Sequence, residues 1–244
     1  MRKAFASALL ALCAWLAVSA QISLVFPQSQ VGPEEVLRWL RQSALPSQEK
    51  AIWLRVLPVA FEKDLVEPGV AQSFLQRLVG TPPTFVSEVT AIMEEVILKG
   101  IPVGHLMNKV SQGIIMGRNW TVITNEIRLR AAVLVATAEV LEPHRPPAEA
   151  KASVSVRIGA LAVKAETPTW DDLVVEMAEA ISDFIVGGGD LNDWGGMESF
   201  VRSRLAQLRG RGLSPALVDR ALEALSPELV GEIISRAFQI ERRQ

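Results

Sequence analysis

The stretch that decides the fold is residues 119–142, NWTVITNEIRLRAAVLVATAEVLE. At 3.6 residues per turn its apolar residues divide between two opposite helix faces, one with Trp120, Ile123, Ile127, Ala131, Leu134, Ala138 and Leu141 and the other with Val122, Leu129, Val133, Ala136 and Val140. A helix that is apolar on two sides is buried, so the stretch predicts a central core helix about 36 Å long. Its longest uncharged run, Ala131–Ala138, is far shorter than the roughly 20 residues that cross a bilayer.

The first twenty residues predict an export signal. Arg2 and Lys3 form a positive start, residues 9–18 form an apolar segment, and Val18-Ser19-Ala20 provides small residues where a signal peptidase cuts. An uncleaved N-terminal anchor is the alternative. Cleavage after Ala20 would remove the only cysteine, so the mature chain would have neither disulfides nor thiol chemistry.

The charge balance of the mature chain is weakly acidic. It would carry 23 basic and 27 acidic residues (25 minus 2, against 27). This balance argues against a nucleic-acid partner, which requires a basic face. Together with the signal, it indicates a bacterial periplasmic or secreted protein without a membrane span in its mature part.

Short apolar stripes at helical spacing, separated by Pro, Gly and Ser, follow one another along the rest of the chain. They predict an all-α multi-helix bundle with short connections. Pro58 is expected to kink or end the second of these helices. The proline-rich segment 143–147 predicts a boundary between two small helical subdomains, residues 21–146 and 147–244. Expected helices outside the central one span residues 33–43, 47–58, 69–79, 84–99, 102–116, 169–186, 197–209, 215–225 and 227–242.

Residues 150–166 fit two patterns. Val154, Val156 and Ile158 alternate with polar residues as in a strand, whereas Ala150, Val154, Ile158, Leu161 and Ala165 form a helical stripe. The alanine content favours the helix, and the strand stays the alternative.

A repeat is suggested by two basic-Gly-apolar turns. Lys99-Gly100-Ile101-Pro102 has a loose counterpart in Arg211-Gly212-Leu213-Ser214, which would make the bundle a degenerate helical-hairpin repeat. The segment Glu95-Val96-Ile97-Leu98-Lys99-Gly100-Ile101-Pro102, followed by a helix and the alanine-rich residues 128–141, resembles a helix-turn-helix unit of exported bacterial all-helical proteins. That resemblance implies export and an all-α fold and carries no activity, cofactor or catalytic residue.

Residues typical of catalysis are scarce. The chain has two histidines, His105 and His144, and no His-x-x-x-His or Glu-x-x-His spacing, so no zinc or di-iron ligand set and no Ser-His-Asp triad is predicted. We expect His105 to be solvated. Two unidentified carboxylates could still form a glycan-hydrolase site. Trp53, Trp120 and Trp170 lie on apolar stripes and are expected in the core rather than as sugar platforms.

Four acids form a ladder on one face of the helix expected at 169–186: Asp172, Glu176, Glu179 and Asp183. Acids at i, i+4, i+7 and i+11 repel one another, so a cation, a basic partner or solvent has to offset the repulsion. An internal alternative is pairing with the basic residues Arg202, Arg204, Arg209 and Arg211 of the next helix. The ladder is a candidate cation site. Asp190-Leu191-Asn192-Asp193 resembles half a calcium loop but lacks the glycine at the sixth position and the closing glutamate.

We therefore expect an exported, non-catalytic helical module that binds another envelope protein or a peptide in grooves between helices. No cofactor is expected. A cell-wall or glycan hydrolase and a cation-dependent regulatory protein are the alternatives.

Overall fold

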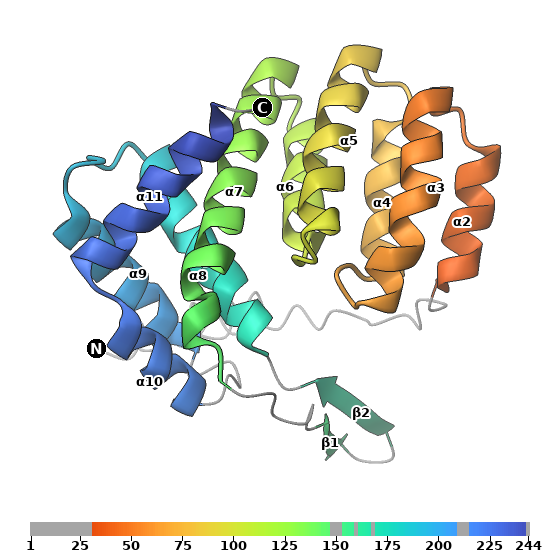
Figure 1. Cartoon of the computed structure of the whole chain (residues 1–244). Helices are drawn as coiled ribbons and strands as arrows, with labels where there is room; N and C mark the ends of the chain where they lie inside the picture. Colours follow the sequence, from red (N-terminus) through yellow and green to blue (C-terminus); the bar gives the residue numbers. More distant parts are fainter. Residues whose placement is uncertain (1–30, 147–152, 159–160, 167–168, 209–214, 243–244) are drawn as a thin grey trace, which may run out of the picture. The chain divides into compact units, whose positions relative to one another are not determined.

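The computed structural model describes residues 31–146, 153–158, 161–166, 169–208 and 215–242, and helices dominate them (Figure 1). The predicted all-α class is confirmed. Residues 32–244 form one compact unit. The predicted signal, residues 1–20, lies outside the described residues. The helices are α2 Pro33–Gln42, α3 Ser47–Glu62, α4 Pro68–Leu78, α5 Pro83–Leu98, α6 Gly104–Ile115, α7 Trp120–Leu141, α8 Trp170–Val186, α9 Trp194–Leu208, α10 Pro215–Ala224 and α11 Pro227–Glu241, with a 3-10 turn η1 at Glu142–His144.

The first six helices stand in two rows (Figure 1). One row contains α2, α4 and α6 and the other α3, α5 and α7, and each helix packs on the next member of its own row. The rows also pack on each other at both ends, where α2 contacts α3 and α6 contacts α7. Such stacking buries a continuous core between short helices that could not bury their apolar faces alone.

Helix α7 occupies the middle of this unit, as its sequence predicts. It packs against α5 and α6 on one side and against α8 and α11 on the other (Figure 1). Every residue from Arg130 to Thr137 is buried, and Val140 and Leu141 are buried as well. Asn119 caps its first turn by accepting a hydrogen bond from the backbone N–H of Thr121 at 2.9 Å.

Several helices begin at a proline, among them α2 at Pro33, α5 at Pro83 and α11 at Pro227. Ser226 caps α11, where its hydroxyl accepts from the N–H of Leu229 at 3.2 Å. Pro58 was expected to kink or end the second helix. It does not end it, because α3 continues through Pro58 to Glu62. The buried stripe Trp53, Val56, Leu57 and Ala60 keeps its packing on both sides of the proline, and this tertiary packing outweighs the lost hydrogen bond.

The helix preferred for residues 150–166 is wrong, because the described residues of this segment form two strands. Strands β1, Ser153–Ile158, and β2, Leu161–Glu166, pair antiparallel, with Val156 opposite Val163. The period-2 alternation of β-branched residues therefore outweighs alanine content.

The boundary between subdomains stays a prediction. It was placed between residues 146 and 147, where the described residues stop, and α7 on its N-terminal side packs on α8 and α11 on its C-terminal side. The proposed repeat also stays a prediction, because its second turn, residues 211–214, lies outside the described residues.

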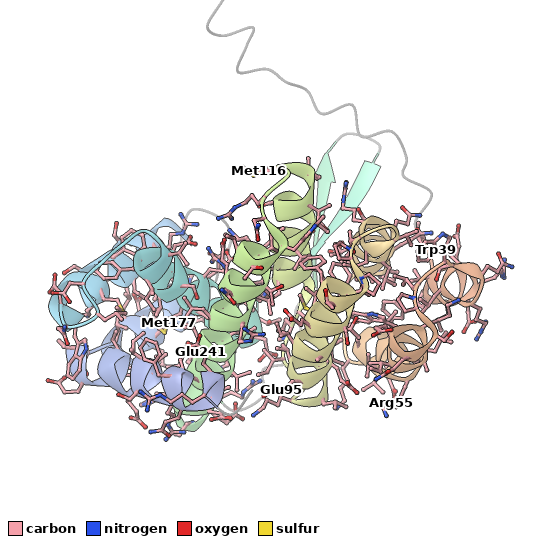
Figure 2. The ribbon with its side chains drawn as sticks, turned by 90° about the horizontal axis from the view of Figure 1, so that it is seen from above. Trp39, Arg55, Glu95, Met116, Met177 and Glu241 are labelled. Atoms are coloured by element: carbon pink, nitrogen blue, oxygen red, sulfur yellow. The ribbon has the colours of Figure 1, made fainter. Side chains whose placement is uncertain are left out.

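The exposure of the methionine side chains differs between the edge and the interior of the helical unit. Met116, which follows α6, points outward at the edge of the molecule and is 74% exposed, whereas Met177 of α8 lies enclosed among the C-terminal helices (Figure 2). Among the described helices, none combines the length and the apolar character that a membrane crossing requires.

Candidate functional site

The turn between α5 and α6 is the motif that the sequence singled out, Lys99-Gly100-Ile101-Pro102. Gly100 has a φ of +72°, a conformation that favours glycine, and it ends α5. The N–H of Gly100 donates to the carbonyl of Ile97 at 2.9 Å and that of Ile101 to the carbonyl of Val96 at 3.3 Å, so these two carbonyls in the last turn of α5 are satisfied. The backbone then turns sharply into α6.

This turn lines a cavity of about 400 Å³, which we call the joint cavity. The other walls come from the last turns of α7, from the segment after η1 and from the first turns of α8. An added Cβ on Gly100 would meet no atom within 4 Å, so the turn leaves the space beside it open. Its lining residues are Lys99, Gly100, Ile101, Pro102, Ala138, Glu139, Glu142, Arg145, Asp171 and Val174.

Opposite charges are paired in the lining of the joint cavity, which also contains the apolar residues Ile101, Pro102, Ala138 and Val174. Lys99 Nζ lies 3.1 Å from Glu139 Oε1, and Arg145 binds Glu142 at 3.0 Å and Asp171 at 2.6 Å. Burial alone would lower the pKa of the Arg145 guanidinium, but its hydrogen bonds and charge interactions with Asp171 and Glu142 outweigh that effect and raise the pKa. All these side chains are partly exposed, so each ion pair contributes about 0–1 kcal/mol to the stability of the fold. At so small a cost, a charged group of a ligand can replace one partner of a pair.

The chemistry of the joint cavity suits binding better than hydrolysis. A glycan hydrolase needs one protonated carboxyl group as general acid. Here a cation pairs with each of the carboxylates Glu139, Glu142 and Asp171. A nearby cation favours the ionised carboxylate over the protonated acid.

A second, more open hollow of about 540 Å³ lies along α10 beside His144. Asp219, Arg220 and Glu223 line it together with small alanines, and the hollow contains no buried apolar residue. It offers less enclosure than the joint cavity does.

The acidic ladder of α8 is brought against protein groups rather than left for a cation. Asp172 forms a capping box with Thr169 at the helix start. Asp183 Oδ1 accepts from Arg130 Nη2 at 2.8 Å, and Glu179 Oε1 lies 4.0 Å from Lys109 Nζ. In the part of the chain that the structure describes, no three His, Cys, Asp or Glu side chains are grouped so as to hold a metal ion.

Of the arginines in the alternative pairing, Arg202 binds residues outside the ladder. Although α8 packs on α9, Arg202 of α9 binds Glu198 at 2.7 Å and the carbonyl of Leu225 at 3.3 Å. Arg209 and Arg211 lie outside the described residues. Among the described residues, the cations that the structure pairs with Glu179 and Asp183 come from α6 and α7, which no local sequence pattern could show.

We call the assembly around Arg130 the Arg130 cluster. Arg130 is only 6% exposed, and its Nε donates to Glu126 Oε1 at 3.1 Å, the i,i+4 pair that the sequence permits. Glu126 also accepts from Arg118 at 2.7 Å. The Nη1 of Arg130 is buried without a hydrogen-bond partner. The members of the cluster are His105, Lys109, Arg118, Glu126, Arg130, Glu176, Glu179 and Asp183.

Two members of the cluster have shifted pKa values. Burial raises the pKa of Glu179, and Glu176 and Asp183 add to this, whereas Lys109 and Arg130 oppose it. Burial, Arg130 and Lys109 lower the pKa of His105 to about 4. The expected solvated His105 is therefore wrong: the side chain is half-buried and neutral at pH 7.

The tryptophans lie where their stripes indicate. Trp53 and Trp170 are buried, and Trp120 is half-buried against Phe85, with ring centroids 4.9 Å apart. None of the three is a free sugar platform.

No family model matches the chain, and neither a curated protein nor a solved structure matches it. The resemblance carried by residues 95–102 thus stays an interpretation, and function has to be argued from the site alone.

Proposed function

We propose that this chain is an exported helical binding module that takes a peptide segment of another envelope protein in the joint cavity. The observation that carries the proposal is the joint cavity itself, whose lining combines two sets of paired charges with apolar residues. Its volume of about 400 Å³ lies within the range of ligand sites, roughly 300–1,000 Å³.

The character of the lining favours a peptide. Ile101, Pro102 and Val174 offer contact to a small apolar side chain, while Arg145 and Glu139 present a cation and an anion at the rim. A peptide supplies both kinds of partner, together with backbone N–H and C=O groups. The two-row stacking of α2–α7 supports the same conclusion by analogy, because stacked helical units commonly bind extended partners.

A variant that fills the cavity tests this proposal. Ala138 lies on α7 at the cavity wall, so Ala138→Phe would occupy the space with a large side chain. The matched control is Ala51→Phe, which adds the same group to an exposed position on α3, away from the cavity.

The probe is a displayed random-peptide library selected on the purified chain. We expect enriched peptides whose affinity falls at least about tenfold in Ala138→Phe, or more than 1.4 kcal/mol, and stays within about twofold in Ala51→Phe. Failure to enrich any peptide, or equal binding by Ala138→Phe, would contradict the proposal.

The two alternatives are tested on the same preparation. Turnover of purified peptidoglycan, lost when a facing acid pair is changed to amides, would establish the hydrolase. A rise in melting temperature on adding calcium would establish the cation-dependent regulator, since a ligand at 100 times its Kd stabilises by about 2.7 kcal/mol.

A further inference from the structure

Three turns meet at one end of the two rows of helices. They are residues 43–46 between α2 and α3, residues 79–82 between α4 and α5, and residues 116–119 between α6 and α7 (Figure 1). Because α6 packs on α4 and α7 packs on α5, the last two turns are neighbours. We call this end of the rows the turn end. It lies opposite the end where residues 99–102 line the joint cavity.

Large apolar side chains are exposed at the two neighbouring turns. Met116 projects outward at the edge of the molecule (Figure 2), and Ile115 before it is 62% exposed. Val122 in the first turn of α7 and Val79 at the end of α4 are exposed as well. Because these side chains stand on turns and helix ends, they suit contact with a flat apolar layer better than enclosure of a ligand.

The charge of the turn end is basic. Within four residues of the three turns, the only acid is Glu49, which is buried. Acids gather instead at the opposite end of the rows. The cations of the turn end are Arg41, Lys50, Arg77 and Arg118, whereas the opposite end has Glu34, Glu35, Glu62, Asp64, Glu67 and Glu95 with Lys63 and Lys99.

Two cations of the turn end are available to a partner. Arg41 and Arg77 lie exposed in the last turns of α2 and α4, and neither forms an ion pair with another described residue. The helix dipole favours cations at these positions and leaves the guanidinium groups in solvent. Lys50 and Arg118 are engaged, by the carbonyl of residue 43 at 2.6 Å and by Glu126 at 2.7 Å.

We propose that the turn end docks on the surface of an anionic phospholipid bilayer, with Ile115, Met116 and Val122 among the acyl chains and Arg41 and Arg77 against the phosphate groups. Such binding strengthens with the apolar area buried and with the attraction of cations to anionic lipids. An anionic surface would repel exposed acids, and the turn end has none close to its three turns. The same repulsion turns the acidic end, with the joint cavity, away from the bilayer.

The first test is cosedimentation of the full chain with phospholipid vesicles. We expect binding to vesicles containing about a third phosphatidylglycerol, much weaker binding to pure phosphatidylcholine, and weakening with salt, because salt screens surface charge. Arg41→Gln combined with Arg77→Gln should weaken binding at least about tenfold, since each cation near an anionic surface strengthens it about fivefold. Lys63→Gln, at the opposite end, is the control and should change binding less than about twofold.

Insertion of the turn end is measured separately, because the apolar residues 9–18 could also attach the chain to vesicles. Cys13→Ser removes the only cysteine, and Met116→Cys or Leu98→Cys then accepts an environment-sensitive fluorophore. Leu98 is the matched control, since it is 66% exposed at the opposite end. With anionic vesicles, we expect the label at position 116 to shift to the blue and brighten several-fold, and the label at position 98 to stay unchanged.

Three results would overturn the bilayer proposal. The first is no response of the label at position 116 to anionic vesicles, whether or not the chain sediments with them. The second is a response that is equally strong on neutral vesicles or in the Arg41→Gln, Arg77→Gln chain. The third is a response to chain concentration without vesicles, which would identify the acidic end of a second copy as the occupant.

Discussion

A single buried hydrogen bond fixes how α3 meets α5. Trp53 Nε1 donates to Thr90 Oγ1 at 3.0 Å, and both residues are almost completely buried. The indole ring also lies edge-on to Phe74, with centroids 5.6 Å apart. Because both side chains are buried, loss of the threonine hydroxyl leaves the Trp53 N–H as a buried, unsatisfied donor.

Thr90→Val should therefore lower the free energy of unfolding by about 1–3 kcal/mol. In a Trp53→Phe background, which has no N–H to satisfy, the same substitution should cost much less. Urea unfolding of the four chains measures the coupling, expected near 1 kcal/mol. Equal costs of Thr90→Val in both backgrounds would show that the hydrogen bond contributes nothing.

Single residues are where sequence reasoning succeeded least. The Glu126–Arg130 pair could be read from i,i+4 spacing, but the burial of Arg130 could not. The reason is that its second partner, Asp183, lies 53 residues away on α8. His105 was misjudged for a similar reason, because its burial, which lowers its pKa most, and the nearby charge of Arg130 on α7 both depend on the tertiary fold.

At the scale of elements, the approach of α6 to α7 depends on one small residue. Gly113 of α6 faces Ile123 of α7, and a Cβ at position 113 would lie 2.9 Å from Ile123 Cγ1 and 3.0 Å from Cδ1. Ile123 is buried, and a β-branched side chain in a helix has one strongly preferred rotamer, so it has little room to withdraw.

Gly113→Ala should lower stability by about 1–3 kcal/mol through overpacking. Gly104→Ala, at the start of the same helix, is the control, since its Cβ would meet Val66 at an ordinary 3.8 Å. There alanine should be neutral or stabilising by up to about 1 kcal/mol. Thermal or urea unfolding compares the two, and a Gly113→Ala chain as stable as the wild type would contradict the close contact.

Most element boundaries followed from local signals. The end of α5 required glycine at position 100, and the start of α8 required the Thr169–Asp172 capping box, both local patterns. The same local logic failed for residues 153–166, where two periodicities were present and composition favoured the wrong one. It also failed at Pro58, where packing on both sides of the proline maintains α3.

At the scale of the whole molecule, the two-row arrangement and the joint cavity were not predictable from the sequence. Helix lengths and short connections indicate an all-α fold but leave open which helices are neighbours. The joint cavity brings together the α5–α6 turn, the end of α7 and the start of α8, which span residues 99–174. The sequence did identify the turn as distinctive, without indicating what it faces.

Helix α7 is the shared core helix, because residues of both the joint cavity and the Arg130 cluster lie on it. Native-state hydrogen exchange at pH 7 tests this directly. The amides of residues 131–137 should exchange only through global unfolding, with an exchange free energy equal to that from urea unfolding. Exchange of these amides at a clearly lower free energy than those of α3 or α5 would contradict the central role of α7.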